Sequence, residues 1–266
     1  MPNQIPVVIL CGGLGTRLRE ETELRPKPMV EIGGKPILWH IINLYSHYGF
    51  NQFILCLGYK SEVIKDYFLN YDFMNNDFTL TIGSKPVLLS PQKLMKNPWK
   101  ITLVDTGESA MTGARVKLIE PHIKSDTFML TYGDGVANIN IAQLMKFHQR
   151  HGKIGTVTGV RPQSRFGELV MEKNTAIEFS EKPQIRQGYI NGGFFVFQKK
   201  FFKYLSAKED LILEQAPLRN LARDRELMVY QHQGFWHCMD TYRDYQLLNN
   251  LWKTGNAPWK ALVNEK

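Results

Sequence analysis

The residues best suited to do chemistry come early in the chain, in a glycine-rich turn that follows an apolar run. Residues 7–10 read VVIL, residues 12–17 read GGLGTR, and RPKP follows at 25–28. Glycines let the backbone approach a ligand closely, and successive exposed N–H groups form a concave anion site. The guanidinium of Arg17 and the ammonium of Lys27 would add fixed positive charge. This combination predicts a cradle for a triphosphate.

Three other interpretations of the turn were weighed. The dinucleotide fingerprint needs a third glycine where Leu18 stands, and an acid after the second strand, where residues 58–60 read GYK. This disfavours an NAD(P)-dependent oxidoreductase. The Walker sequence is absent, because no Lys-Ser or Lys-Thr follows the glycines. A tight strand-to-helix turn with surface charges is the remaining alternative, and the Thr-Arg pair and the proline-flanked lysine weigh against it.

Two aspartates are candidates for holding a metal ion. Asp134 lies between two glycines directly after the apolar run 127–132, and Asp240 follows a second predicted strand at 227–231. An acid at the carboxyl end of a central strand points into the crevice where open α/β sheets bind ligands. Because Mg²⁺ is often held by one or two carboxylates together with substrate phosphates, this pair suggests a magnesium site.

Elements that could position these residues follow a strand–helix alternation. Predicted strands at 7–10, 53–57, 127–132 and 156–160 are separated by segments with helical spacing, and this alternation predicts parallel strands with right-handed crossovers. We therefore expect an α/β fold, a Rossmann-like three-layer sandwich with a mostly parallel mixed central sheet. A hairpin excursion is expected at about 71–104. A C-terminal helical and strand appendage at about 206–266 would return Asp240 to the site, within a single domain spanning 1–266.

Composition limits the classes of partner. The chain has 266 residues, 43% of them hydrophobic, and a formal net charge of +8. Its Lys and Arg residues are scattered, so a field that steers anionic substrates is favoured over nucleic-acid binding. No apolar run reaches the roughly 18 to 20 residues of a membrane span. Three cysteines without metal-type spacing, and an N-terminus without a basic leader, favour a cytoplasmic protein.

Several stretches together resemble a known family. GGLGTRL followed by RPKPMVEIGGKPIL resembles the signature of the sugar-phosphate nucleotidyltransferases. TLVDTGESAMTGAR, YGDGVAN, INGGFFVF, GFWHCMDTYRD and GNAPWK resemble the glucose-1-phosphate cytidylyltransferases within it, over nearly the whole chain. The resemblance implies condensation of CTP with α-D-glucose 1-phosphate to CDP-glucose and pyrophosphate. It also implies Mg²⁺ as cofactor and a homo-oligomer, either a trimer or a hexamer.

Site residues follow from the resemblance and the motifs together. The candidate nucleotide-binding residues are Leu10, Cys11, Gly12, Gly13, Leu14, Gly15, Thr16, Arg17, Lys27, Ser109, Thr112, Arg115 and Gly133. The candidate sugar-phosphate residues are Gly167, Glu181, Lys182, Asn191 and Gly192. Arg17 and Lys27 are the expected catalytic cations, and the resemblance makes Asp134 and Asp240 the metal ligands. A helix starting at Gly113 is expected to present free N–H groups to an anion or a base.

Some questions stay open at the level of sequence. A backbone carbonyl can distinguish cytosine from uracil or thymine, so CTP rests on resemblance alone, and UTP or dTTP is the nearest alternative. A non-catalytic relative that only binds a sugar nucleotide is also possible, although Arg17, Lys27 and both aspartates are present. The excursion could be a surface feature, a lid or a subunit contact.

Overall fold

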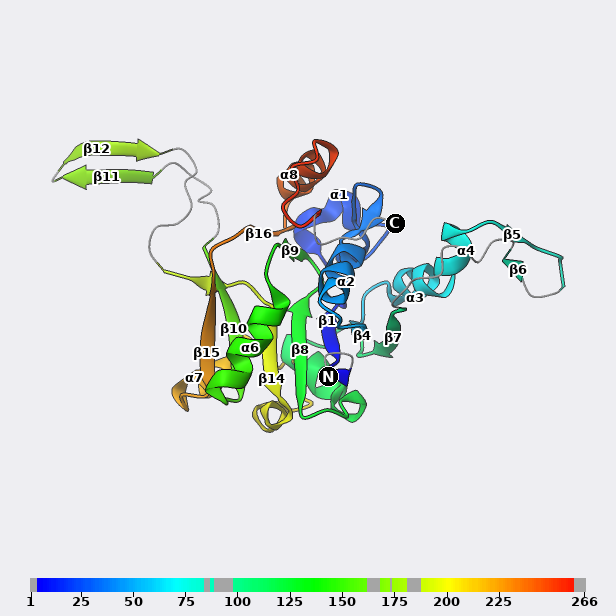
Figure 1. The fold of residues 1–266 in the computed structure, drawn as a ribbon, viewed down its shortest axis with the longest axis horizontal. Helices are drawn as coiled ribbons and strands as arrows, with labels where there is room; N and C mark the ends of the chain where they lie inside the picture. The colour runs from blue at the N-terminus through cyan, green and yellow to red at the C-terminus, as the bar shows by residue number, and fades with distance from the viewer. Residues whose placement is uncertain are drawn as a thin grey trace.

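A mixed β-sheet forms the central layer of the computed structural model, which describes residues 4–83, 87–88, 98–161, 168–172, 174–180 and 188–260 (Figure 1). Its strands, in spatial order, are β13 (Ile190–Asn191), β10 (Gly155–Val160), β14 (Phe195–Gln198), β8 (Thr127–Tyr132), β1 (Val7–Leu10), β4 (Gln52–Leu57) and β7 (Lys100–Asp105). A further strand, β15 (Leu227–His232), pairs in parallel with β10. Strands β1, β4, β7 and β8 are parallel to one another, whereas β14 runs antiparallel to β8. The predicted α/β fold with a mixed sheet is confirmed.

Helices cover both faces of the sheet. The α-helices are α1 (Arg19–Thr22), α2 (Ile37–His47), α3 (Ser61–Leu69), α4 (Tyr71–Asn75), α5 (Thr112–Leu118), α6 (Ile141–His151), α7 (Ala216–Arg223) and α8 (Tyr242–Lys253). The 3₁₀ segments are η2 (Thr16–Leu18), η3 (Lys27–Met29), η5 (Glu120–His122) and η6 (Lys199–Tyr204). Alternate residues of β1 enter two apolar clusters: Val7 and Ile9 pack with α2 and α6, and Val8 and Leu10 pack with α5, η6 and α7. This alternation gives three layers, because successive side chains of a strand point to opposite faces.

Small two-stranded sheets complete the chain. They pair β2 (Glu31–Ile32) with β3 (Lys35–Pro36), β5 (Phe78–Thr79) with β6 (Val87–Leu88), β9 (Gly135–Ala137) with β16 (Trp236–Cys238), and β11 (Glu168–Glu172) with β12 (Thr175–Ser180). Figure 1 shows the β5–β6 and β11–β12 hairpins extending from opposite sides of the body. None of the helices in the described ranges is long and apolar enough to span a membrane.

One predicted boundary needs correction. The excursion was expected to reach about residue 104, but residues 100–105 form β7 at the edge of the main sheet, in register with β4. Ile101, Leu103 and Val104 belong to this strand, so the excursion ends earlier. In the expected C-terminal appendage, β15 pairs with β10 along the whole of that strand.

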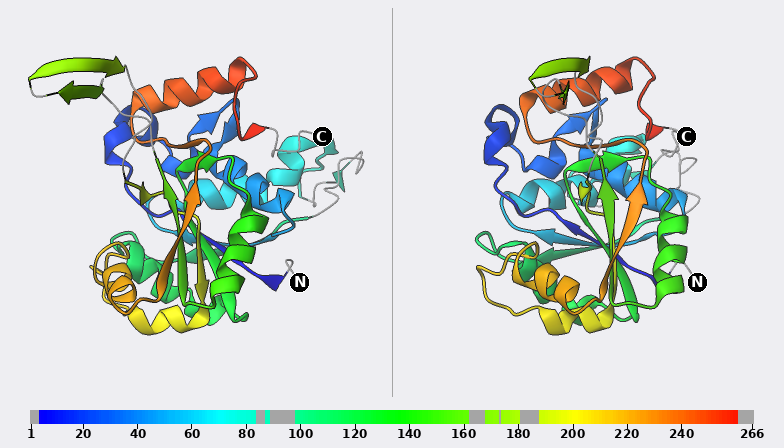
Figure 2. Two further views of the ribbon diagram at one scale, coloured as in Figure 1. Left: turned by 60° about the vertical axis from the view of Figure 1, so that its left-hand side comes forward. Right: turned by 90° about the vertical axis from the view of Figure 1, so that its left-hand side faces the viewer.

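The parallel strands fix where ligands can bind. Leu10, Leu57, Asp105 and Tyr132 end β1, β4, β7 and β8, and these four carboxyl ends lie along one edge of the sheet. Open α/β sheets bind ligands at this edge. Figure 2 shows α8 lying across the same end of the molecule.

Candidate active site

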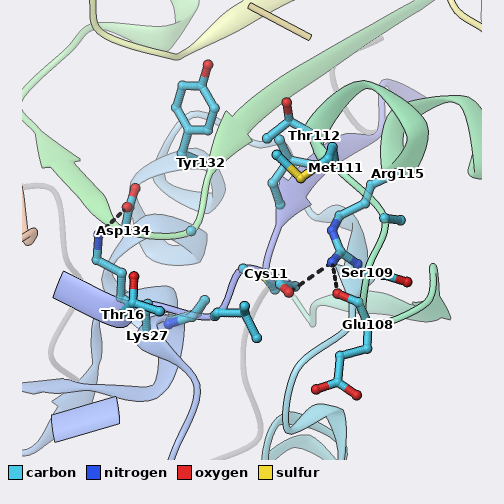
Figure 3. A pocket seen from close by; sticks show the side chains of 18 of the residues that line it. Cys11, Thr16, Lys27, Glu108, Ser109, Met111, Thr112, Arg115, Tyr132 and Asp134 are labelled. Carbon is cyan, nitrogen blue, oxygen red and sulfur yellow. Dashed lines mark hydrogen bonds and ion pairs between the residues drawn. The ribbon is translucent and has the colours of Figure 1, made fainter. Parts of the chain in front are cut away.

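A cavity of about 450 Å³ opens at this edge of the sheet (Figure 3). It is lined by Leu10, Cys11, Gly12, Gly13, Leu14, Gly15, Thr16, Arg17, Lys27, Pro28, Glu108, Ser109, Ala110, Met111, Thr112, Arg115, Tyr132, Gly133 and Asp134. All of the predicted nucleotide-binding residues are in this set. Loops after β8, β1 and β7 therefore meet around one space.

The glycines of the turn have different reasons to be glycine. A Cβ on Gly12 would lie 2.3 Å from the guanidinium carbon of Arg115, so this position needs glycine for packing. Gly15 has φ +63°, in the left-handed region that favours glycine. A Cβ on Gly13 would meet nothing within 4 Å. Among these three glycines, Gly13 is therefore the one that neither packing nor a positive φ requires, and its backbone is open to the cavity.

Arg115 lines the cavity, and its guanidinium also binds the chain itself. Its guanidinium is buried and donates to the carbonyl oxygens of Gly12, Leu57, Gly107 and Glu108 at 2.6–3.0 Å. These bonds hold the turn after β1 against the ends of β4 and β7. Arg115 lines the cavity, but its terminal nitrogens already serve the chain itself, which indicates a structural contribution to the site.

The expectation of free N–H groups at the start of α5 is wrong. The N–H groups of Gly113 and Ala114 donate to the carbonyl of Leu211 at 2.8 and 3.2 Å. Thr112 is also engaged, because its hydroxyl donates to Glu214 at 2.8 Å and accepts from the N–H of Leu213 at 2.9 Å. A backbone contact from the C-terminal part of the chain thus caps the helix, and such a contact leaves no local signature.

Asp134 and Asp240 come together through the small β9–β16 sheet. Cys238 pairs with Gly135, and the N–H of Met239 donates to the carbonyl of Asp134 at 2.8 Å. The residue before β9 is therefore brought beside the residues after β16. A capping box fixes the start of α8, in which Thr241 is the N-cap and Asp244 accepts its backbone N–H. The predicted convergence of the two aspartates is confirmed.

Lys27 lies between the two carboxylates. Its ammonium nitrogen is 2.7 Å from Asp134 Oδ2 and 2.5 Å from Asp240 Oδ1, and its side chain is 11% exposed. Burial alone would lower the pKa of Lys27, but the two carboxylates outweigh it and the pKa is raised. Arg17 Nη1 contacts Asp240 Oδ2 at 3.0 Å from a side chain that is 71% exposed. Burial would raise the pKa of Asp240, yet Lys27 and Arg17 together lower it, so this carboxyl stays ionised.

The donor set fits Mg²⁺ better than a metal held by protein alone. Among the described residues, no three His, Cys, Asp or Glu side chains gather at a point that could hold a metal ion. Asp134 and Asp240 supply two carboxylates within reach of one ammonium nitrogen. Mg²⁺ typically takes one or two carboxylates and completes its shell with water and substrate phosphates. The pair therefore suits an ion that binds together with a phosphate ligand.

A second cavity of about 200 Å³ adjoins the first. Its lining includes Asn191, Gly192, Trp236 and Asp240, and Arg17, Tyr132 and Asp134 line both cavities. Trp236 Nε1 donates to the carbonyl of Gly192 at 2.8 Å, which fixes the turn between β13 and β14. Asn191 and Gly192, which line this smaller cavity, are two of the residues predicted to bind the sugar phosphate. The other residues predicted for that ligand, Gly167, Glu181 and Lys182, lie outside the described residues.

Tyr132 and Glu214 belong to the surroundings of the site and were not among the predicted residues. Tyr132 ends β8 and stands between the cavities, and its position just before Gly133 was the available signal. Glu214 accepts from the Tyr132 hydroxyl at 2.5 Å. It lies in a segment, ILEQAPL, that carries no recognisable motif.

Comparisons with known proteins agree with this geometry. The family model for nucleotidyl transferase matches residues 6–246. The chain is 48% identical to glucose-1-phosphate cytidylyltransferases of Salmonella typhi and Salmonella typhimurium, over 255 residues, covering 96% of this chain and 98% of each relative. A solved UDP-glucose pyrophosphorylase in complex with UDP-glucose superposes with a TM-score of 0.68 at 16% identity, covering 94% of this chain and 99% of that one. At 16% identity, the likeness to this solved structure shows a shared fold.

Proposed function

Because the chain belongs to the nucleotidyl transferase family, we propose that it transfers the cytidylyl group of CTP to α-D-glucose 1-phosphate, giving CDP-glucose and pyrophosphate. Identity of 48% with glucose-1-phosphate cytidylyltransferases across almost their whole length supports the choice of substrates. The observation that carries the proposal is the meeting of Lys27, Arg17 and both aspartates where the two cavities join.

The chemistry of this reaction explains the kind of residues present. An oxygen of the sugar phosphate forms a bond to the α-phosphorus of CTP, and the bond from that phosphorus to the bridging oxygen breaks as pyrophosphate leaves. The attacking phosphate is already an anion near neutral pH, so a general base is unnecessary. Since anions must approach one another, the barrier lies in positioning and charge repulsion. Cations and exposed N–H groups are the groups that lower it.

Each group is assigned a place in this scheme. The N–H groups of the glycine turn and Arg17 hold the pyrophosphate part of CTP in the larger cavity. Lys27 neutralises charge on the triphosphate, and Asp134 and Asp240 hold Mg²⁺. When bound, the ion supplies positive charge beside the phosphate oxygens. Asn191 and the turn that Trp236 fixes support the sugar phosphate in the smaller cavity. The expected homo-oligomer, a trimer or a hexamer, stays a prediction that sedimentation equilibrium tests.

The test is pyrophosphate release from CTP, UTP, dTTP and GTP, each with glucose 1-phosphate and Mg²⁺. We expect the highest kcat/KM with CTP, and loss of release on chelation of the metal. Faster release with UTP or dTTP would overturn the choice of base while keeping the reaction class. No release with any triphosphate, together with tight binding of CDP-glucose, would favour the non-catalytic alternative.

A further inference from the structure

Glu214 contacts both sides of the candidate site although it belongs to none of the motifs. The Tyr132 hydroxyl donates to one carboxylate oxygen at 2.5 Å, and the Thr112 hydroxyl donates to the other at 2.8 Å. Thr112 lines the larger cavity, whereas Tyr132 lines both. The Glu214 carboxylate therefore binds one residue of the larger cavity and one residue that the two cavities share.

The hydrogen bonds continue from Tyr132 into the smaller cavity. Asn191 Nδ2 donates to the Tyr132 hydroxyl at 3.0 Å, and Asn191 Oδ1 accepts from the N–H of Gly193 at 2.9 Å. Thr112, Glu214, Tyr132 and Asn191 thus form one continuous series. It runs from the predicted nucleotide side to the predicted sugar-phosphate side.

The direction of each hydrogen bond in the series is fixed. A carboxylate only accepts, so the Tyr132 proton goes to Glu214 and the phenol oxygen is left to accept from Asn191. The Asn191 amide is oriented in turn. Without Glu214 the Tyr132 hydroxyl loses its acceptor, and the Asn191 amide keeps one fixed contact, from the N–H of Gly193.

Backbone contacts hold Glu214 itself in place. The carbonyl of Leu211 accepts from the N–H of Gly113, and the N–H of Leu213 donates to Thr112 Oγ1. The segment before α7 therefore runs along the start of α5. Glu214 reaches the site from an anchored backbone, which is what a residue that orients others requires.

We propose that Glu214 is a positioning residue for both substrates: it holds Thr112 in the lining of the larger, nucleotide cavity and, through Tyr132, holds Asn191 in the lining of the smaller, sugar-phosphate cavity. The identity of the two ligands rests on the proposed function. The link between the two cavities rests on the hydrogen bonds from Thr112 and Tyr132 to Glu214 and from Asn191 to Tyr132. Glu214 acts through these neighbours and touches no reacting atom.

The test compares Glu214→Ala with Tyr132→Phe and with a matched control, Glu226→Ala. Glu226 also accepts two hydrogen bonds, from Lys153 Nζ and from the N–H of Ile154, but it lies beside the start of β10, away from both cavities. Steady-state rates give kcat and the KM of CTP and of glucose 1-phosphate separately, and thermal unfolding reports folding.

Glu214→Ala is expected to raise both KM values about tenfold or more, because hydrogen bonds to a charged group are lost. Tyr132→Phe is expected to raise mainly the KM of glucose 1-phosphate, and the double variant should raise that KM no further than the larger single change. Glu226→Ala should leave both KM values at the wild-type level. Unchanged KM values in Glu214→Ala, or a rise for CTP alone, would overturn the proposal.

The proposed function can fail independently of this inference. A wild-type protein that releases no pyrophosphate refutes the proposed reaction. A crystal structure of Glu214→Ala needs no turnover and still tests the inference. We expect the Tyr132 hydroxyl to leave its place near Asn191 Nδ2, and an unmoved Tyr132 would refute the positioning role.

Discussion

Replacing Lys27 by methionine removes a cation that contacts both site carboxylates. Asp134 and Asp240 each place an oxygen within 2.7 Å of the same ammonium nitrogen. In Lys27→Met these carboxylates stay close together, with Arg17 remaining at Asp240. Removing one partner of a buried ion pair costs about 3–5 kcal/mol, because the remaining charge is left uncompensated. We expect the free energy of unfolding to fall by about that amount at pH 7 in the presence of EDTA.

The metal dependence of the variant gives the sharper readout. In the wild type a divalent cation must compete with Lys27 for both carboxylates, whereas in Lys27→Met this competitor is absent and Arg17, on an exposed side chain, remains at Asp240. A ligand present at tenfold its Kd stabilises the folded state by about 1.4 kcal/mol. Mg²⁺ should therefore restore more stability to the variant than it adds to the wild type. Turnover should nevertheless stay about 10²- to 10³-fold below wild type, because the positive charge on the triphosphate is missing.

Urea unfolding at pH 7, with EDTA and with Mg²⁺, measures these effects. Lys153→Met is the matched control, since Lys153 contacts Glu226 at 3.1 Å from a side chain that is 41% exposed. Exposed pairs contribute about 1 kcal/mol at most, so the control should lose little and show no response to Mg²⁺. If Lys27→Met is as stable as wild type in EDTA, or gains no more than wild type from Mg²⁺, the reasoning fails.

Three further predictions follow from the same contacts. Gly12→Ala should lose about 1–3 kcal/mol of stability, because its Cβ would lie 2.3 Å from the buried guanidinium of Arg115. Gly13→Ala should fold normally and raise the KM of CTP. Equal melting temperatures of the two variants would contradict the packing argument. Burial lowers the pKa values of His40 and His148 to about 4, so the unfolded chain binds their protons first. Stability should therefore fall by about 2 kcal/mol for each histidine between pH 7 and pH 5, and a flat profile in urea titrations would argue against it. Asp240→Asn should lose about 10²- to 10³-fold in kcat, so near-native turnover would remove Asp240 from the site.

Local pattern was enough to predict where the site lies. The run VVIL before the glycine turn and the run before Asp134 are both short and apolar, as buried parallel strands are. Parallel strands share one carboxyl edge, so residues that directly follow them in sequence meet in space. Asp240 could be placed beside Asp134 because it follows a further predicted strand and because the family resemblance pairs the two.

Backbone-mediated contacts could not be predicted in the same way. Arg115 lines the cavity as predicted, but its bonds to the carbonyl groups of Gly12 and Leu57 could not be predicted, because carbonyls are present at every position of every sequence. The same limit applies to Leu211, whose carbonyl closes the start of α5, and to Glu214, whose partners are distant in the chain. The sequence identified reactive side chains, while the groups that hold them required the fold.

The central claim is that an oxygen of the sugar phosphate attacks the α-phosphorus of CTP and that pyrophosphate leaves. Glucose 1-phosphate labelled with ¹⁸O in its phosphate tests it directly by ³¹P NMR of the products. The account predicts ¹⁸O in the oxygen that bridges the two phosphorus atoms of CDP-glucose, an isotope shift at both of them, and unlabelled pyrophosphate. An unshifted α-phosphorus signal, or ¹⁸O in the pyrophosphate, would contradict it.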